Sequence, residues 1–220
     1  MTSKPTLSIA IQPPPGPDTE LSLPDQPNSN PSVFQDAMTV RMRVFVDEQG
    51  CSADAEIDED DARSWQWVIS TTAPDSGTGI PVAVIRLVPP PQMPHDLLTY
   101  PDVTSEFPYD WAHEPCIKLT RVAVLSQYRG LGLGRRLVET ALEWAMQHAA
   151  EIDEAAARVA TRSHWTERPV QWQGLVLVHA QVQVEKMYKG LGFQTDESLG
   201  RWDEEGIEHV GMFRRVEVAR

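Results

Sequence analysis

The hydrophobic positions of residues 32–48 recur at three- to four-residue intervals, at Phe34, Met38, Met42 and Phe45. That spacing places apolar side chains on one face of a helix and therefore predicts an amphipathic helix over this range. Ser32 is placed to cap the start of the helix with its hydroxyl, and Gly50 is a natural residue for its end.

Runs of apolar and β-branched residues predict strands elsewhere in the chain. The strongest is IKLTRVAVL, and the full set of expected strands comprises residues 6–11, 65–71, 80–88, 117–125, 174–179 and 205–216. Residues 65–71 and 80–88 read as a hairpin. Helical spacing returns at residues 182–190 and 132–150, the second with an apolar stripe of Leu133, Leu137, Ala141, Trp144 and Ala145. This order of elements indicates a mixed α/β fold.

Three polar or proline-rich segments interrupt this pattern. Residues 13–31 carry repeated prolines and are expected to form a loop, and residues 89–116 contain too many prolines for one regular element. Residues 160–172 form a third insertion. Since no internal repeat is present and 220 residues suit one domain, residues 1–220 are interpreted as a single domain with insertions at 13–31, 89–116 and 160–172.

Composition and charge exclude several classes of function. The net charge of −13 disfavours binding to a nucleic-acid backbone and favours the attraction of cations. No window approaches the ~18–20 apolar residues of a membrane span. Because the N-terminus shows no secretion or transit signal, a cytoplasmic location is expected. Cys51 and Cys116 are too few for a disulfide framework or a zinc cluster, so no metal is expected.

A glycine-rich turn between the strand 117–125 and the helix 132–150 carries the strongest chemical signal. Residues 129–134 read R-G-L-G-L-G. Glycines let a backbone approach an anion closely, and the first amides of a helix have no partner within the helix. Because the helix dipole also favours negative charge at this end, the segment suits a pyrophosphate. Arg129, Arg135 and Arg136 add positive charge.

Three other interpretations of this turn are weaker. A dinucleotide fold requires G-x-G-x-x-G near the start of a parallel sheet, and a nucleoside triphosphate loop requires G-K-[ST]. The turn matches neither pattern. A glycine-rich turn without a ligand leaves the combination of strand, arginines and helix unexplained.

The turn resembles the R-x-x-G-x-G/A motif of the GCN5-related N-acetyltransferase (GNAT) superfamily. The preceding RVAVL is similar to the central strand of that superfamily, and AQVQVEKMYKGLGF is similar to its second motif, a helix ending in Y-x-x-x-G-F at Tyr188, Gly192 and Phe193. The resemblance spans residues 34 to 216. It implies the GNAT fold, a mixed and mostly antiparallel sheet with a splayed strand pair, flanked by helices.

Two further segments resemble a subgroup of GNAT enzymes that act on small amines. RMRVFVDEQG followed by EIDEDD is similar to its R-x-x-V-F-V-x-E-Q-G and E-x-D-x-x-D signature, and EEGIEHVGMFR is similar to its closing strand. The three insertions depart from the subgroup and leave the substrate open. Arg41 and Arg43 are expected to form ion pairs with nearby carboxylates.

The resemblance implies acetyl-CoA as the cosubstrate. Its pantetheine is expected along Val122, Ala123 and Val124, and its pyrophosphate on the amides of Arg129, Gly130, Leu131, Gly132, Leu133, Gly134 and Arg135. Tyr188 matches the tyrosine that protonates the departing thiolate. The base that accepts the proton of the amine is expected to be Glu48 first and His209 second, with Asp58 and Asp61 as alternatives from the acidic run.

The acceptor follows from charge and aromatic content. An acidic chain disfavours sugar phosphates, whereas aromatic rings and carboxylates suit an unphosphorylated amino sugar such as glucosamine. Asp58, Asp61 and Trp111 are therefore candidate substrate-binding residues, while Trp67 and Trp202 are expected in the core. The alternatives are a polyamine, an aminoglycoside-like cation, a protein or peptide amine, and a non-catalytic acyl-CoA-binding module. A homodimer is a further expectation, because strand edges are exposed and the resemblance to the superfamily implies dimers.

Overall fold

The computed structural model describes residues 6–26, 29–72, 79–95, 97 and 108–219. It forms two compact units, of which the first comprises Met1–Leu87 and Arg121–Ala141 and the second Val88–Thr120 and Leu142–Arg220. Strand β4 (Cys116–Val124) and helix α3 (Leu133–Gln147) each contribute residues to both units.

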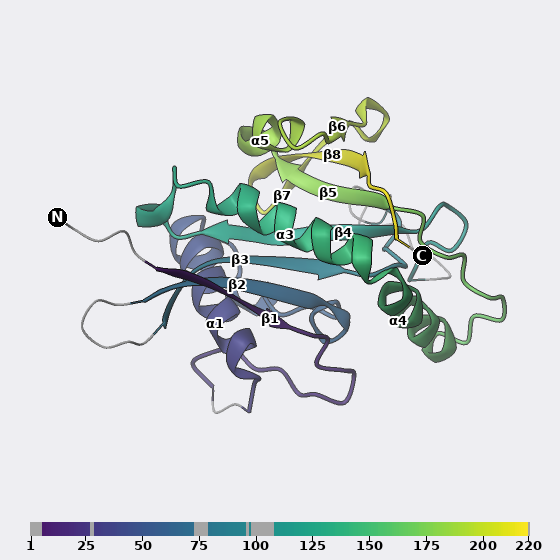
Figure 1. The fold of residues 1–220 in the computed structure, drawn as a ribbon, viewed down its shortest axis with the longest axis horizontal. Helices are drawn as coiled ribbons and strands as arrows, with labels where there is room; N and C mark the ends of the chain where they lie inside the picture. Colours follow the sequence, from purple (N-terminus) through teal and green to yellow (C-terminus); the bar gives the residue numbers. More distant parts are fainter. Residues whose placement is uncertain (1–5, 27–28, 73–78, 96, 98–107, 220) are drawn as a thin grey trace. The chain divides into compact units, whose positions relative to one another are not determined.

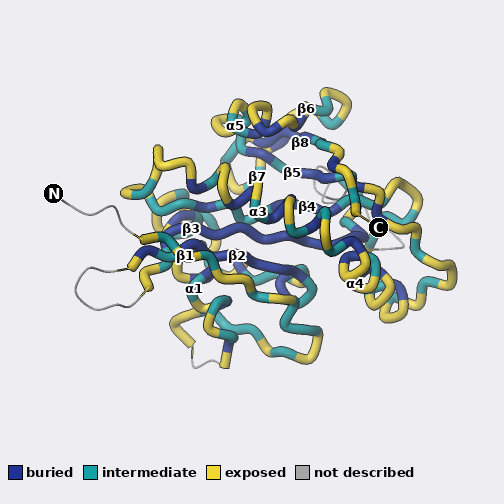
Figure 2. Tube along the Cα trace, in the orientation of Figure 1, coloured by how far each residue is buried: buried dark blue, intermediate teal, exposed yellow. Residues whose placement is uncertain are grey.

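The first unit is built on antiparallel strands. β1 (Leu7–Gln12) pairs with β2 (Trp65–Thr72), which pairs with β3 (Gly79–Val88), and the second half of β4 follows β3 in the strand order. The hairpin of β2 and β3 confirms the sequence prediction, although its turn at residues 73–78 lies outside the described residues. Both strands are buried along most of their length (Figure 2).

Helix α1 (Ser32–Arg41) supplies the core on one face of these strands, and α3 runs across the opposite face in Figure 1. The hydrophobic cluster beneath α1 joins the helix to β2, β3 and β4 through Ala37, Val40, Val44, Val68, Val84 and Ala123. The predicted helix 32–48 is thus present, but its last part, Met42–Glu48, is a π-helix. Gly50 follows with a φ of 78°, as expected for a helix end.

The expected cap at Ser32 is wrong. Ser32 is the first helical residue, Pro31 occupies the capping position, and no side chain accepts a hydrogen bond there. The proline ring fixes φ, and Pro31, with φ −54° and ψ 143°, leads directly into the helix without a side-chain cap.

The second unit contains a parallel pair of strands. β4 pairs in parallel with β5 (Leu175–Gln181), from Cys116 opposite Leu175 to Leu119 opposite Val178. β5 pairs antiparallel with β8 (Ile207–Arg215), which also pairs with β6 (Gln194–Thr195) and β7 (Arg201–Glu204). Helices α4 (Ala149–Arg162) and α5 (Glu185–Lys189) complete the unit. The strand pairs are therefore mixed and mostly antiparallel, as predicted.

Two expected elements require correction. The helix predicted at 132–150 ends at Gln147, and α4 begins at Ala149, because His148 leaves the helical backbone with φ −121° and ψ 33°. The strand predicted at 205–216 is β8, which begins at Ile207, and β7, which was not predicted, precedes it across a turn at Glu205 and Gly206. Within the proline-rich insertion 89–116, residues 96 and 98–107 lie outside the described residues.

Candidate active site

The glycine-rich turn begins where β4 ends. A short 3₁₀ turn at Ser126–Tyr128 leads to Arg129, and α3 starts at Leu133. Gly130 and Gly132 have φ values of 80° and 74°, a left-handed region that L side chains rarely adopt. A Cβ added to either glycine would meet no heavy atom within 4 Å, so the backbone of the turn faces open space. This arrangement is the strand, turn and helix start expected of an anion site.

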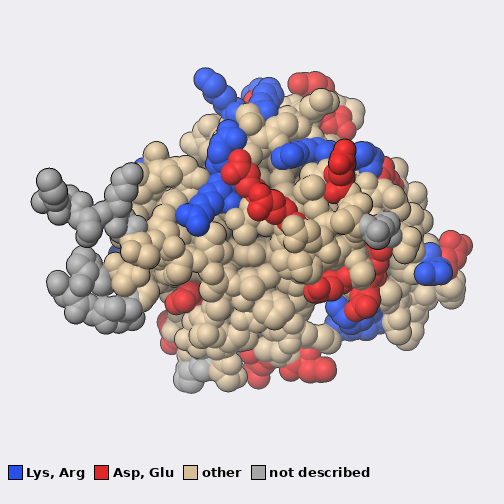
Figure 3. All heavy atoms as spheres, viewed as in Figure 1, with Lys and Arg blue, Asp and Glu red and all other residues tan. Residues whose placement is uncertain are grey.

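The charges around the start of α3 are already paired in part. Arg129 donates to Glu48 through both terminal nitrogens, at 2.5 and 2.8 Å, and its Nε donates to the carbonyl of Val124 at 3.0 Å. Arg135 lies 3.6 Å from Glu139 one turn along the helix, and Figure 3 shows basic and acidic side chains side by side over α3. The open space at Gly130 and Gly132 therefore borders the backbone of the turn, while these side chains are engaged in ion pairs.

The contact with Arg129 changes the interpretation of Glu48. Both carboxylate oxygens of Glu48 accept hydrogen bonds from the guanidinium, and the two side chains are each about two-fifths exposed. A bidentate pair of this kind orients both partners. Glu48 thus holds Arg129 and the turn at the end of β4, a geometry that does not favour it as the free base expected from the sequence.

Residues Val122, Ala123 and Val124 form the last part of β4. Ala123 is buried against α1, whereas Val122 and Val124 are half-buried. The amide of Leu125 donates to the carbonyl of Val82 at 2.9 Å, which ties the end of β4 to β3. The parallel pairing of β4 with β5 extends from Cys116 to Leu119 and so ends before Val122.

Arg121 marks the change within β4. Its φ of 52° is left-handed, which is uncommon for a residue other than glycine and costs of order 1–3 kcal/mol. Such a conformation persists only when surrounding contacts fix it. The side chain supplies those contacts, with its Nε 3.4 Å from Glu56 and one Nη 3.2 Å from Asp58.

Arg121 belongs to a cluster of three arginines and three carboxylates, which we call the ionic cluster: Arg41, Arg86, Arg121, Glu56, Asp58 and Asp61. Arg41 from α1 contacts Asp61 at 2.7 Å and Glu56 at 3.0 Å. Arg86 from β3 contacts Asp58 at 2.6 and 2.8 Å and Asp61 at 3.0 Å. Arg41 and Asp61 are fully buried. The acidic run 54–61 is therefore partly internal rather than a solvated loop.

The ionic cluster changes the roles expected for Asp58 and Asp61. Burial raises the pKa of each carboxyl, but nearby arginines lower it by more. Arg86 and Arg121 act in this way on Asp58, and Arg86 and Arg41 act on Asp61. Both pKa values therefore lie below the usual range. Both groups are thus ionised and already neutralised. Asp61 is inaccessible to a substrate, and Asp58 is engaged by two arginines, which disfavours both as ligands of an amine. The predicted pairing of Arg41 is confirmed, as is that of Arg43, which contacts Asp47 at 3.0 Å.

Arg86 and Arg121 are partners of the acidic run that were not predicted from sequence. A signal was present at residue 86, because an arginine within the apolar strand IPVAVIRLV needs a buried carboxylate. At residue 121 only the structure reveals the left-handed backbone.

Tyr188 lies at the end of α5 in the second unit and is 4% exposed. Its ring packs edge to face against Phe193 with the centroids 5.4 Å apart. Burial raises the pKa of the Tyr188 hydroxyl above its ordinary value, so the group keeps its proton at neutral pH. A protonated hydroxyl is the state that a proton donor requires.

His209 lies in the second unit beside two groups that the sequence analysis did not single out. Its Nε2 is 4.0 Å from Oε2 of Glu204, whose Oε1 accepts a hydrogen bond from Nε1 of Trp202 at 2.6 Å and lies 3.5 Å from Nδ1 of His179. Burial raises the pKa of Glu204, but hydrogen bonds from His179 and Trp202 lower it to about 2. Burial and Lys118 lower the pKa of His179 to about 3. Glu204 is therefore an anion beside a neutral His179.

The buried His179 predicts a loss of stability on acidification. Because its folded-state pKa of about 3 lies below the ordinary value of 6.5, the unfolded chain binds more protons between these values. The free energy of unfolding should therefore fall as pH decreases from 6.5 towards 3, by at most about 1.4 kcal/mol per pH unit from this group. Urea unfolding at pH 6.5, 5.5 and 4.5 measures the slope.

A matched pair of variants assigns that slope. His179→Asn should flatten the pH dependence of the free energy of unfolding between pH 4.5 and 6.5. Glu204 contributes little in this range, because its pKa is 4.5 in the unfolded chain and lower in the folded protein. His164→Asn should leave it unchanged, because His164 is exposed and asparagine tolerates its left-handed φ of 55°. An equal slope in His179→Asn and the unmodified protein would contradict this assignment.

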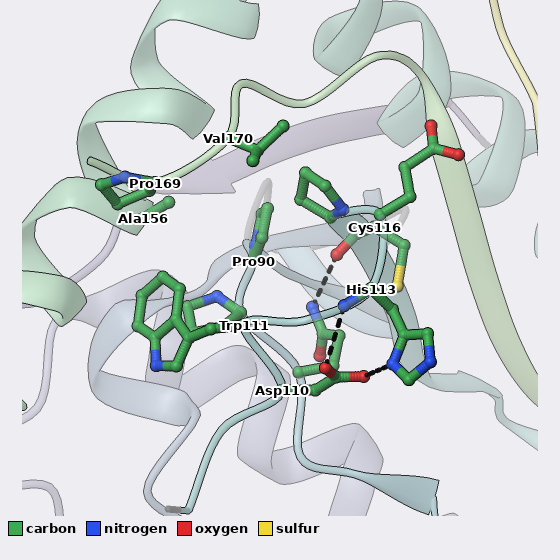
Figure 4. A pocket seen from close by; sticks show the side chains of 12 residues that line it. Pro90, Asp110, Trp111, His113, Cys116, Ala156, Pro169 and Val170 are labelled. Atoms are coloured by element: carbon green, nitrogen blue, oxygen red, sulfur yellow. Dashed lines mark hydrogen bonds and ion pairs between the residues drawn. The ribbon is translucent and has the colours of Figure 1, made fainter. Parts of the chain in front are cut away.

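Trp111 lies in a shallow cavity of about 50 Å³ in the second unit, the Trp111 pocket, lined by Pro90, Pro91, Gln92, Asp110, Trp111, His113, Glu114, Pro115, Cys116, Ala156, Pro169 and Val170 (Figure 4). The Trp111 ring stacks on Trp165 with the centroids 5.3 Å apart, and Asp110 contacts His113 at 2.7 Å. Cys116 in this pocket pairs with Leu175 at the start of β5, whereas His209 pairs with Gln181 at its end. The structure therefore does not bring Trp111 and His209 together.

The remaining tryptophans are mostly structural. Trp67 and Trp202 are buried, as predicted, and Trp65 and Trp172 are buried as well. In the described part of the chain, no group of three or more His, Cys, Asp or Glu side chains is arranged to hold a metal ion. Within the same residues, none of the helices combines the length and apolar character needed to cross a membrane.

Solved structures share this fold at low sequence identity. A Lactobacillus plantarum protein whose name marks it as a candidate N-acetyltransferase has a TM-score of 0.55 and 22% identity, over 95% of this chain and 97% of its own. Escherichia coli ElaA has a TM-score of 0.52 and 22% identity, over 96% and 100% of the two chains. An acyl-CoA N-acyltransferase from Pseudomonas aeruginosa has a TM-score of 0.52 and 21% identity, over 95% and 99%. These similarities show the fold.

The family itself is shown by sequence. The model of the acetyltransferase (GNAT) family matches residues 34–164, which is more than half of the chain. That range contains β4, the glycine-rich turn and α3, the elements in which the anion site was predicted. The chain therefore belongs to the GNAT family of N-acetyltransferases, enzymes that use acetyl-CoA or another acyl-CoA as the acyl donor.

Proposed function

We propose that this enzyme transfers the acetyl group of acetyl-CoA to a small primary amine. The observation that carries the choice of donor is the pair of left-handed glycines, Gly130 and Gly132, whose backbone faces open space directly before α3. A pyrophosphate approaches such a backbone without meeting side chains, and the helix start favours its charge.

The residues around the turn fit acetyl-CoA. The amides of residues 129–135 would hold the pyrophosphate, and the backbone of Val122, Ala123 and Val124 would pair with the pantetheine, since the parallel ladder of β4 ends at Leu119. Arg129 is held by Glu48 and by the carbonyl of Val124, which keeps the turn against the end of the strand. When bound, acetyl-CoA supplies the acetyl group as a reactive thioester.

Two proton transfers accompany the reaction. Tyr188 is proposed as the donor to the departing thiolate, supported by its protonated hydroxyl in a buried setting. His209 is proposed as the base in preference to Glu48, because both oxygens of Glu48 are engaged by Arg129.

An unphosphorylated amino sugar such as glucosamine is the first acceptor that we propose. Glu204 provides a negative charge beside the Trp202 indole, a combination of carboxylate and aromatic ring that suits a cationic sugar. The net charge of −13 favours a cation over a sugar phosphate. Trp111 remains a candidate substrate contact only if the acceptor extends along the length of β5.

A panel of amines tests this proposal directly. Release of CoA thiol from acetyl-CoA is measured with glucosamine, glucosamine 6-phosphate, spermidine and a lysine peptide. We expect the fastest release with glucosamine and a slower rate with its 6-phosphate, because the phosphate meets an acidic protein. Faster release with spermidine or with the peptide would show that the acceptor is not an amino sugar, while acetyl-CoA would remain the proposed donor.

Tyr188→Phe provides the control for chemistry in the same assay. It should lower the rate of thiol release while the affinity for acetyl-CoA, measured by calorimetry, stays the same. If acetyl-CoA binds and none of the amines accelerates release, the chain is an acyl-CoA-binding module and the proposed transfer is wrong.

A further inference from the structure

The hairpin of β7 and β8 brings one carboxylate and one imidazole to the same place. Its two-residue turn, Glu205–Gly206, has φ values of 52° and 84°, the left-handed pair that joins antiparallel strands tightly. The register sets Glu204 opposite Ile207 and Trp202 opposite His209. Glu204 and His209 are thus diagonal neighbours, within reach of each other across the hairpin.

The two oxygens of Glu204 differ in their surroundings. Oε1 accepts from Nε1 of Trp202 at 2.6 Å and lies 3.5 Å from Nδ1 of His179. Oε2 lies 4.0 Å from Nε2 of His209, and no described residue donates a hydrogen bond to it. The carboxylate is held by one oxygen, and its other oxygen faces His209.

His209 is held in the same way, by one nitrogen. Nδ1 of His209 lies 2.8 Å from the backbone carbonyl of Ile207. A carbonyl only accepts, so Nδ1 carries a proton, and in the singly protonated form of the ring Nε2 is an acceptor. The anionic Oε2 of Glu204 is an acceptor too.

The 4.0 Å between these two acceptors is too long for a direct hydrogen bond, which spans about 2.7–3.2 Å. A group that carries at least two N–H or O–H donors fits between them, with about 2.8 Å to each atom. The negative charge of Glu204 favours a positively charged donor over a neutral one. A primary ammonium has both properties.

We propose that the ammonium group of the acceptor amine binds between Oε2 of Glu204 and Nε2 of His209. The inference rests on the proposed function and names the amine site of that reaction. One N–H of the ammonium donates to Glu204. A second N–H bond breaks, its proton forms a bond to Nε2 of His209, and its electron pair stays on the amine nitrogen, which becomes nucleophilic. Glu204 stabilises the imidazolium that results.

The surroundings of the pair suit this role. The Glu204 side chain is 39% exposed, which leaves a path from solvent, while His209 is 10% exposed and sheltered. The indole of Trp202 stacks beside His209 at 6.4 Å and packs edge to face against His179 at 4.9 Å and His95 at 4.7 Å. Because His179 has a pKa of about 3, it stays neutral and does not compete for the carboxylate as a cation.

Binding is tested without acetyl transfer. The imidazole signals of His209 are followed by NMR during titration with ethylammonium and, separately, with ethyltrimethylammonium, which has the charge but no N–H group. We expect ethylammonium to shift the His209 signals saturably and ethyltrimethylammonium to leave them in place. Equal shifts with both cations, or none with ethylammonium, would overturn the site, and a bridging water would then account for the gap.

Variants separate binding from proton transfer. Glu204→Gln keeps an oxygen for the Trp202 indole but removes the charge, and should raise KM for the amine roughly tenfold to a hundredfold with a smaller change in kcat. His209→Phe should lower kcat roughly a hundredfold or more. Glu208→Gln, the same change at an exposed position of the same hairpin, should alter neither parameter. An unchanged KM in Glu204→Gln would contradict the proposal.

The two proposals fail in different ways. If ethylammonium shifts His209 but no amine accelerates release of CoA thiol, the amine site stands and the proposed transfer is wrong. If transfer proceeds while the His209 signals do not respond and Glu204→Gln keeps its KM, the transfer stands and the amine binds elsewhere.

Discussion

Replacing Asp61 with alanine is expected to lower the free energy of unfolding by about 3–5 kcal/mol. Asp61 is fully buried and contacts Arg41 at 2.7 Å and Arg86 at 3.0 Å. It also accepts hydrogen bonds from Gln66 and from the amide of Asp58. Its removal leaves the three arginines of the ionic cluster with only two carboxylates, Glu56 and Asp58, and an unbalanced desolvated charge is costly. Urea unfolding at pH 7 measures the loss.

Asp47→Ala is the matched control for Asp61→Ala. Asp47 also pairs with an arginine, Arg43 at 3.0 Å, but the two side chains are 54% and 70% exposed. Surface pairs contribute about 0–1 kcal/mol, so the control should unfold close to the unmodified protein. Asp61→Asn, which keeps the shape and removes the charge, should lie between the two. A loss below about 1 kcal/mol in Asp61→Ala would show that the ionic cluster does not stabilise the first unit.

Gly132→Val is expected to weaken the binding of acetyl-CoA roughly tenfold to a hundredfold. Residue 132 has a φ of 74°, which a β-branched side chain adopts only with strain. A Cβ at this position meets no protein atom within 4 Å and projects into the open space before α3. The valine would therefore occupy the surface that the pyrophosphate approaches. Isothermal calorimetry with acetyl-CoA and with CoA measures the change.

Gly16→Val separates backbone strain from the loss of the binding surface. Gly16 has a φ of 95°, and a Cβ there also meets no heavy atom within 4 Å. Both valine variants should lose stability, each by about 1–2 kcal/mol, but Gly16→Val should keep its affinity for acetyl-CoA. Equal affinity in the two variants would show that the cofactor does not use the turn.

Periodic segments of the fold could be predicted from sequence, and short or broken ones could not. The hairpin of β2 and β3, strand β4 and the start of α3 have strong apolar patterns, which burial produces directly. The break at His148 was missed because the apolar stripe continues through Ala145 and Ala149 on both sides of it. β6 has two residues and β7 has four, which are too few to show a period.

Within the candidate site, the features that depend on backbone conformation could be predicted best from the sequence. Glycines report a left-handed turn, so Gly130 and Gly132 could be placed on a helix start from sequence alone. Roles that depend on pairing between distant parts of the sequence could not be assigned. Glu48 and its partner Arg129 are 81 residues apart in the sequence, and Asp58 and its partner Arg86 are 28 residues apart. Glu204 could have been found from the D-E-E-G turn that precedes His209.

The ionic cluster is electroneutral, since Arg41, Arg86 and Arg121 balance Glu56, Asp58 and Asp61. It therefore contributes nothing to the net charge of −13, and the whole excess of acid belongs to the rest of the chain. Mobile ions screen exposed charges and leave desolvated pairs largely untouched. Dissolved salt should thus weaken the attraction of this enzyme for cations without loosening the contacts that hold Arg121 in β4.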